Sequence, residues 1–506
     1  MKISIRKFVH SVARAKPLVR WAAYFGLLLR LSFGKAAQFI PVLGSIAKSA
    51  DALLALQSGS YNPPKSFPSA GKLPCSIGHT PKEVELIIVG SGPGGALAAM
   101  GAKARGENFV MVEAGRDLNP WAPSHSFQQM FESFANGGQD VILSYPPIPF
   151  TQGEAWGGGS EINSGLFHKL PKKVAAKWSA ETKISQQKLE DCGEQVAKDL
   201  KVRTQGKGDI GLYDQSPMID MGRTLGWEGG VVPRWRTYSG QSYVHHGVSS
   251  VYLSTLEPNQ ILKGHKVESL KPNSKNIEVR LKSGSCAHTF LAQKVCLSAG
   301  TLETPRLLVK SGLAKASDFK FSFHAMIREV AEFDRPVNSM IDLDPHQFWS
   351  GDRLQKIGAA VGTPELLQAT MSSRGATFNG ELERVASYYS SVPSEGNSGV
   401  VKFFGQLHPF LIPSKSFNAK VLEAQKTLRS AIVGAGGKLI GNGPPSLSTV
   451  HIFGTIPIGN SKIIDNNGRL ILDPERIYIR DASLLPSHPL VNPQGPLMQL
   501  ILALES

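Results

Sequence analysis

Residues 84–95 read VELIIVGSGPGG, a short apolar run that leads directly into a glycine-rich turn. The apolar run predicts a buried parallel strand, and the small-residue run at 96–104 predicts a helix after it. Three glycines of the turn fit the pattern G-x-G-x-x-G. In this pattern the first glycine allows the tight bend, the second lets the backbone approach a pyrophosphate, and the third lets helix and strand pack closely. We therefore expect a dinucleotide at the start of this helix, where free N–H groups bind phosphate, in contact with Gly90, Gly92, Pro93, Gly94 and Gly95.

A second apolar run, at 109–112, predicts the next strand and ends at Glu113. Glu113 follows Gly95 by 18 residues, close to the spacing at which an acid binds a ribose hydroxyl in this type of fold. An acid at this position argues against a 2′-phosphate, and so against NADP. Strand, helix, strand and acid in this order indicate a dinucleotide-binding α/β domain.

Composition indicates a folded protein with a basic N-terminal extension. The chain has 506 residues, of which 41% are hydrophobic and 19% charged, enough for two or three substructures around a buried core. The net charge is +15, but residues 1–50 hold nine Lys or Arg and no Asp or Glu. Because the extension supplies most of the excess, we do not interpret the charge as a nucleic-acid surface. No cysteine spacing suggests a metal site or a disulfide framework, which favours a reducing, cytoplasmic location.

The extension, residues 1–56, allows three interpretations: a helix on a membrane surface, a targeting segment, or a helix that packs on the protein. The apolar run at 21–29 is too short to span a bilayer. Basic residues beside Trp, Tyr, Phe and Leu suit an amphipathic helix on an anionic membrane surface, and residues 1–50 would then make a peripheral membrane contact. Alternatively, this helix packs on the protein itself. Five prolines with Ser and Gly make 57–82 a predicted linker.

Four further stretches resemble the glucose–methanol–choline (GMC) family of FAD-dependent oxidoreductases. They are Glu113-Ala114-Gly115, the run GGGSEINSG at 157–165, the run SAGTLETPRLL at 298–308, and the tail with DASLLP at 481–486 and VNPQG at 491–495. The resemblance implies an α/β (α+β overall) protein. Its FAD-binding Rossmann-like domain would carry an inserted substrate domain built on an antiparallel sheet. We expect the FAD-binding domain at 83–171, 241–320 and 446–506, and the substrate domain at 172–240 and 321–445.

The resemblance also implies further contacts with FAD. A Gly-Gly-Gly-Ser run lets the main chain pass close to a flat ligand, and the strand predicted at 477–479 ends beside an acid, where ligands of α/β sheets bind. The helix predicted at 494–505 would direct its N-terminus at the flavin. Ile162 stands where some relatives attach FAD through a histidine, so we expect non-covalent FAD. The expected contacts are Gly158, Ser160, Asn163, Ala299, Gly300, Asp481, Ala482, Pro493 and Gln494.

His451 and Asn492 form the expected catalytic pair. HIFGT at 451–455 resembles the family's H-x-x-G-T stretch, and Asn492 occupies the partner position. Histidine is the natural base for the proton of an alcohol near neutral pH. We expect His451 to take this proton while the alcohol hydride passes to flavin N5, and Asn492 to hold the substrate oxygen. His488 is expected either to line this site or to cap its loop.

Three functions remain open from the sequence. The first is an FAD-dependent alcohol oxidase or dehydrogenase whose electrons pass to O₂, a quinone or a protein. The second keeps the fold with lyase or photodecarboxylase chemistry. The third is a non-catalytic, membrane-associated flavoprotein. The resemblance to the His–Asn pair favours the first, and the identity of the alcohol does not follow from the sequence.

Overall fold

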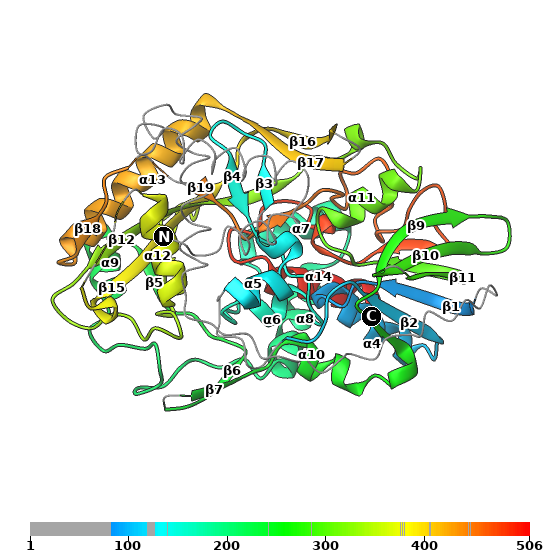
Figure 1. The fold of residues 1–506 in the computed structure, drawn as a ribbon, viewed down its shortest axis with the longest axis horizontal. Helices are drawn as coiled ribbons and strands as arrows, with labels where there is room; N and C mark the ends of the chain where they lie inside the picture. Colours follow the sequence, from blue (N-terminus) through cyan, green and yellow to red (C-terminus); the bar gives the residue numbers. More distant parts are fainter. Residues whose placement is uncertain are drawn as a thin grey trace, which may run out of the picture.

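The computed structural model describes residues 82–118, 127–138, 140–240, 242–284, 286–374, 376, 378, 380–403, 406–443, 445 and 447–506. Expectations for the extension (1–56) and nearly all of the linker (57–82) lie outside these residues. Two sheets organise the described part, one on each side of Figure 1.

The first sheet contains the strand that the glycine turn predicts. β1 (Lys82–Val89) lies between β2 (Phe109–Glu113) and β11 (Cys286–Leu297), parallel to both. Four consecutive residues of β1, 86–89, are buried, as expected where helices cover both faces of a parallel sheet. The order is β8-β2-β1-β11-β10-β9, and the outer strands are β8 (Ile261–Lys263), β10 (Ile277–Ser283) and β9 (Lys266–Pro272). The end of β11 also pairs with β21 (Ile477–Ile479).

Helices cover this sheet with segments from distant parts of the chain. α4 (Pro93–Ala104) begins at the glycine turn and packs against α14 (Gln494–Glu505), which also packs against α8 (Gln186–Asp199). Gly495 allows one close approach, because a Cβ on it would lie 2.1 Å from the carbonyl oxygen of His168. The first and last described helices therefore share one core.

The second sheet is antiparallel, with the order β18-β12-β15-β14-β13-β5. Its strands are β5 (Glu228–Val231), β12 (Ser322–Glu332), β13 (His346–Trp349), β14 (Lys356–Ala359), β15 (Val385–Pro393) and β18 (Lys438–Ile440). Two short strands, β19 (Leu447–Ser448) and β20 (Ile452–Phe453), also pair with β12. This agrees with the expected mixture of an FAD-binding fold and an antiparallel sheet.

The two faces of β12 have different surroundings. Phe323, Ala325 and Ile327 point into an apolar core that includes residues of α13 (Lys415–Gly434), the long helix over this sheet in Figure 1. Successive side chains of a strand point to opposite faces, so His324, Met326 and Arg328 share the other face. That face is directed at the site described below.

The remaining elements connect or flank the two sheets. They include α5 (Phe127–Ser133), β3 (Asp140–Ile142), β4 (Ile148–Phe150), α6 (Gly159–Ile162), α7 (Lys172–Thr182), α9 (Pro217–Leu225), β6 (Arg236–Ser239), β7 (Ser242–His245), α10 (Val248–Val251), α11 (Glu303–Lys310), α12 (Pro364–Ser373), β16 (Gly396–Phe403), β17 (Gln406–Pro413) and 3-10 turns of three or four residues.

The packing differs from the expected domain boundaries in two places. α7 and α8 were assigned to the substrate domain with 172–240, but their buried residues join the core of the first sheet, since α8 packs against α14. β19 and β20 lie in the segment expected to be FAD-binding, 446–506, yet pair with β12. Both differences arise because the chain crosses between the sheets several times. The other boundaries stay predictions.

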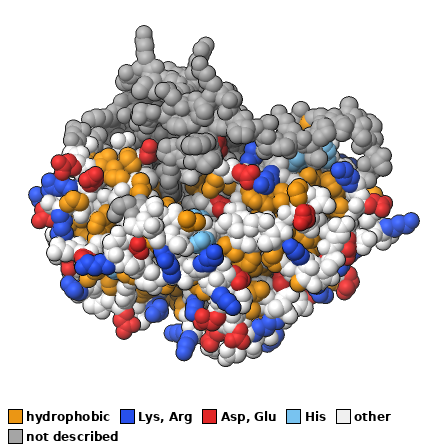
Figure 2. Space-filling view, turned by 90° about the horizontal axis from the view of Figure 1, so that it is seen from below, with side chains coloured by type: hydrophobic (Ala, Val, Ile, Leu, Met, Phe, Trp, Pro, Cys, Tyr) orange, Lys and Arg blue, Asp and Glu red, His pale blue; other side chains and the backbone are white. Residues whose placement is uncertain are grey.

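Two further observations concern the cysteines and the surface. Cys286 is disulfide-bonded, which the spacing of the cysteines did not suggest; Cys192 and Cys296 are free and buried. Among the described residues, none of the helices is both long and apolar enough for a membrane span. In Figure 2, Lys/Arg and Asp/Glu side chains are interspersed over the described surface.

Candidate active site

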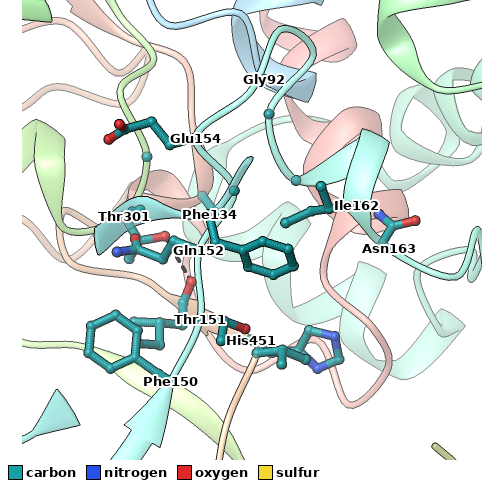
Figure 3. A pocket seen from close by; sticks show the side chains of 18 of the residues that line it. Gly92, Phe134, Phe150, Thr151, Gln152, Glu154, Ile162, Asn163, Thr301 and His451 are labelled. Carbon is teal, nitrogen blue, oxygen red and sulfur yellow. Dashed lines mark hydrogen bonds between the residues drawn. The ribbon is translucent and has the colours of Figure 1, made fainter. Parts of the chain in front are cut away.

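A cavity of about 950 Å³ is lined by segments from both sheets. Gly92, at the glycine turn, and His451, at the antiparallel sheet, lie at opposite ends of the view in Figure 3, with Phe134 and Ile162 between them. Most of the expected site residues line this cavity: Gly90, Gly92, Pro93, Gly94, Glu113, Gly158, Asn163, Ala299, Gly300, His451, Asp481, Ala482, Asn492, Pro493 and Gln494. Two do not, Gly95 and Ser160.

The glycines at one end form a cradle for a ligand. A Cβ on Gly94 would lie 1.8 Å from the carbonyl oxygen of Arg480, and one on Gly95 would lie 2.0 Å from that of Gly90. These two glycines therefore bring helix and strands together. A Cβ on Gly92 or Gly300 would meet nothing within 4 Å, although both residues line the cavity. Their exposed backbone is what a dinucleotide needs for close approach.

Two acids fix the loops around this cradle. Glu113 accepts hydrogen bonds from Ser91 N (2.8 Å), Ser91 Oγ (2.7 Å) and Gly115 N (2.7 Å). Asp481 accepts from Gly300 N (2.9 Å), from Thr304 Oγ1 (2.5 Å), and from the N and Oγ of Ser483. Burial raises the pKa of Asp481, and these hydrogen bonds oppose the rise. Both carboxylates thus hold the cavity wall, and a ribose contact by Glu113 stays a prediction.

The Gly-Gly-Gly-Ser run lies beside the glycine turn, since a Cβ on Gly158 would lie 2.8 Å from Gly92 Cα. Ser160 differs from its expected role. Its hydroxyl is buried and donates to Gly157 O (2.9 Å), which fixes the short helix α6 instead of facing the cavity. Asn163 lines the cavity and donates to Gln494 Oε1 (2.8 Å), so it joins this run to the start of α14.

His451 is held by a second histidine. Its Nδ1 lies 3.0 Å from Nδ1 of His324, and the two rings are nearly perpendicular, at 84°. Burial and the nearby cationic side chain of Lys356 hold the pKa of His451 well below its usual range; burial and the neighbouring histidines do the same for His324. Both rings are therefore neutral near pH 7. If Nδ1 of His451 carries the hydrogen and donates to His324, Nε2 of His451 keeps a free lone pair.

Asn492 is oriented by a buried lysine. Lys356 Nζ lies 2.6 Å from Asn492 Oδ1. An ammonium can only donate, so the amide oxygen must face Lys356 and the amide NH₂ group is left for other partners. Lys356 is only 4% exposed, and burial lowers its pKa to about 7. Asn492 therefore presents its NH₂ group, a hydrogen-bond donor, to the cavity.

His488 caps its loop, which settles the two expectations for it. Its Nδ1 accepts from Leu490 N (3.1 Å), and its ring packs against those of His324 and Phe453. Burial lowers its pKa to about 3. It does not line the cavity.

Several residues near the pair come from 321–445, where the sequence contains no recognisable motif. They are His324, Arg328, Lys356 and Tyr389, and Ser448 follows shortly after. Arg328, Tyr389 and Ser448 line the cavity. The one available signal was the alternation on β12, where His324, Met326 and Arg328 are two residues apart and so share a face.

Comparison with known proteins agrees with this geometry. The family model described as GMC oxidoreductase matches residues 128–338. An uncharacterised GMC-type oxidoreductase, y4nJ from Sinorhizobium fredii (strain NBRC 101917 / NGR234), is 24% identical over 478 residues, which cover 83% of this chain and 93% of that protein. A second, Rv0492c from Mycobacterium tuberculosis (strain ATCC 25618 / H37Rv), is 24% identical over 477 residues, covering 83% and 75%.

Solved structures share the fold. Pyridoxine 4-oxidase from Mesorbium loti superimposes with a TM-score of 0.61 at 15% identity, covering 83% of this chain and 98% of its own. A mutant of the Aspergillus oryzae RIB40 formate oxidase, studied for its FAD modification, superimposes with a TM-score of 0.63 at 13% identity, covering 84% and 97%. The glycine cradle, the strand order of the two sheets and the matched proteins therefore all agree with the fold of the GMC oxidoreductases.

Proposed function

Since the chain belongs to the GMC oxidoreductase family of FAD-binding flavoproteins, we propose that it oxidises an alcohol, with His451 as the base. The observation that carries the proposal is the meeting of His451 and Asn492, 41 residues apart in sequence, at the cavity that the glycine turn also lines. Bound FAD supplies the acceptor for the two electrons that leave the alcohol carbon as hydride.

The glycine cradle fits the cofactor. Gly90, Gly92 and Gly94 would hold the pyrophosphate at the start of α4, where the N–H groups and the helix dipole favour negative charge. Pro493 and Gln494 at the start of α14 would lie near the flavin, and the helix would favour negative charge there as well. Ile162 has no group that could bond to FAD, which supports non-covalent binding at this position.

His451 would accept the hydroxyl proton at Nε2. A base must be unprotonated to act, and the lowered pKa of His451 keeps it so throughout the neutral range. His324 positions this base, because accepting the Nδ1 hydrogen of His451 leaves the lone pair on Nε2. Asn492, fixed by Lys356, would donate its NH₂ hydrogen to the substrate oxygen and stabilise the negative charge that forms on it.

The test is the visible absorption spectrum of the purified holoenzyme before and after anaerobic addition of alcohols. We expect yellow flavin bands that one class of alcohol bleaches. His451→Ala should retain the flavin but slow bleaching by roughly 10²-fold or more, the usual contribution of a positioned base. His246→Ala is the control, since His246 lies outside the cavity wall. Bound flavin that no alcohol reduces would refute the proposal.

His324 provides a second arm of this experiment. His324→Asn keeps an acceptor for the Nδ1 hydrogen of His451, whereas His324→Leu removes it. If His324 positions the base, the leucine variant loses kcat with little change in KM and the asparagine variant recovers part of the loss. Equal losses in both variants would limit His324 to a structural role.

A further inference from the structure

Arg328 directs a guanidinium to the cavity with little to hold it there. It lies on β12, on the face shared with His324 and Met326, and it lines the cavity. Its Nη1 donates to Ser448 Oγ (2.9 Å), while its Nε is buried and has no hydrogen-bond partner among the described residues. A buried donor without a partner is unfavourable, so an acceptor group of a ligand would be stabilised at this Nε.

The charge of Arg328 is also unbalanced. Within the described part of the chain it forms no ion pair, and the stretches outside that part contain a single acid, Asp51. Burial lowers the pKa of Arg328, and no carboxylate offsets this effect. The nearby Arg374, in contrast, has a counter-charge. Its Nη2 lies 2.9 Å from the carboxylate of the buried Glu329, which lies on the opposite face of β12 from Arg328.

The groups around Arg328 are hydrogen-bond donors. Tyr389 lies directly opposite Arg328 on β15 and lines the cavity. Its hydroxyl oxygen accepts from Gln347 Nε2 (2.8 Å), so its own proton is available to a ligand. The Ser448 hydroxyl, which accepts from Arg328, likewise keeps a proton to donate. Arg328 and Ser448 are thus in contact, Tyr389 lies opposite Arg328 on the neighbouring strand, and all three line the cavity. Arg328 among them carries a full positive charge.

We propose that this group of Arg328, Tyr389 and Ser448 binds a carboxylate of the substrate, so that the substrate is an alcohol that also carries a carboxylic acid. The inference rests on the proposed function, since it names the substrate class of the same site. A planar carboxylate matches the forked guanidinium and accepts from both of its edges. Apolar side chains that line the cavity, including Leu366 and Met326 two residues before Arg328 on β12, suit a hydrocarbon portion between the two functional groups.

The test measures binding and needs no turnover. Butanoate and its neutral isostere butanamide are titrated into the oxidised holoenzyme, followed by calorimetry and by the shift of the flavin bands. We expect butanoate to bind at least about tenfold more tightly than butanamide, the equivalent of one charge-assisted hydrogen bond. Arg328→Gln should abolish this preference, Arg328→Lys should keep part of it, and Arg223→Gln, an exposed arginine on α9, should leave it unchanged.

The outcomes separate this inference from the proposed function. His451→Ala should bind butanoate as the wild type does, although it reduces flavin slowly. Butanoate binding that depends on Arg328, in a protein whose flavin no alcohol bleaches, would keep the carboxylate site and refute alcohol oxidation. Equal affinity for butanoate and butanamide, or an unchanged preference in a flavin-loaded Arg328→Gln variant, would overturn the carboxylate site.

Discussion

Lys356 is a buried amine with no carboxylate beside it in the described part of the chain. Besides Asn492, Lys356 contacts the ring of Tyr389, with 5.6 Å from Nζ to the ring centroid. Its burial lowers its pKa to about 7, whereas an unfolded lysine titrates near 10.5. The folded state therefore binds fewer protons than the unfolded state between these pH values, and the free energy of unfolding rises with pH across this window.

Replacing Lys356 by Met tests whether the buried ammonium of Lys356 destabilises the folded protein. The variant removes the cost of burying an ammonium, a few kcal/mol at pH 7 and below, and loses one hydrogen bond worth about 1 kcal/mol. We expect the Tm of Lys356→Met to exceed that of the wild type at pH 6, and the difference to shrink steadily toward pH 10. Thermal unfolding followed by circular dichroism at several pH values measures both. A difference that is independent of pH would show that Lys356 is not destabilised by burial.

The glycine turn between β1 and α4 combines two roles that substitution can separate. Gly94 makes a backbone contact that no Cβ can enter, while Gly92 faces the cavity with φ −60°, a value that alanine also adopts. Gly94→Ala should therefore destabilise the protein by about 3 kcal/mol or more through overpacking. Gly92→Ala should change stability by less than about 0.5 kcal/mol but weaken FAD binding at least about tenfold, because its methyl group occupies the approach to the phosphates.

Urea unfolding of the apoprotein gives the stabilities, and quenching of flavin fluorescence gives the dissociation constant for FAD. Each of the two variants serves as the control for the other, because both add one methyl group to the same turn, two residues apart. Normal FAD affinity in a folded Gly92→Ala protein would place the phosphates away from this turn.

Among the helices and strands, those with a clear local sequence pattern are the ones that the sequence predicts. β1, β21 and α14 begin and end close to their expected residues, because each is an apolar run bounded by glycine, proline or an acid. β12 escapes such recognition for a physical reason. Met326 breaks its alternation on the cavity face, and Glu329 breaks it on the covered face, where the acid is buried against Arg374.

For the site, the residues found from sequence are those of the glycine-rich and family motifs, which depend on local backbone geometry. The ones missed, such as Lys356 and Arg328, come from different strands of the antiparallel sheet. Their relation depends on strand order and register, which no local pattern records.

At the scale of the molecule, a buried charge cluster ties the walls of the cavity together. Asp342 pairs with Arg234 Nη1 (2.6 Å) and Arg236 Nη1 (2.8 Å), and Arg236 also donates to the carbonyl oxygen of Asn163 (3.3 Å). Arg234 is fully buried and Asp342 nearly so. The cluster connects the loop before β13 to the run that lies against the glycine turn.

Replacing Asp342 by Asn leaves two buried guanidinium groups without a counter-charge. We expect the free energy of unfolding to fall by about 3–5 kcal/mol, the usual effect of breaking a buried pair from one side. Asp220→Asn, which removes an exposed pair with Arg223, should cost less than about 1 kcal/mol. Urea unfolding with flavin release as a second probe measures both. Similar losses in the two variants would show that water reaches the Asp342 cluster.

The pairing of β1 with β11 and the packing of α4 against α14 have a consequence for synthesis. A ribosome makes β1 some 200 residues before β11 and some 400 before α14, so β1 leaves the exit tunnel with its neighbour β2 long before its other neighbour, β11, exists. The nascent chain must carry the apolar residues 86–89 of β1 with one strand edge unpaired through much of translation, a state prone to aggregation. If α14 completes the flavin site as proposed, a product that ends before this helix would never become yellow.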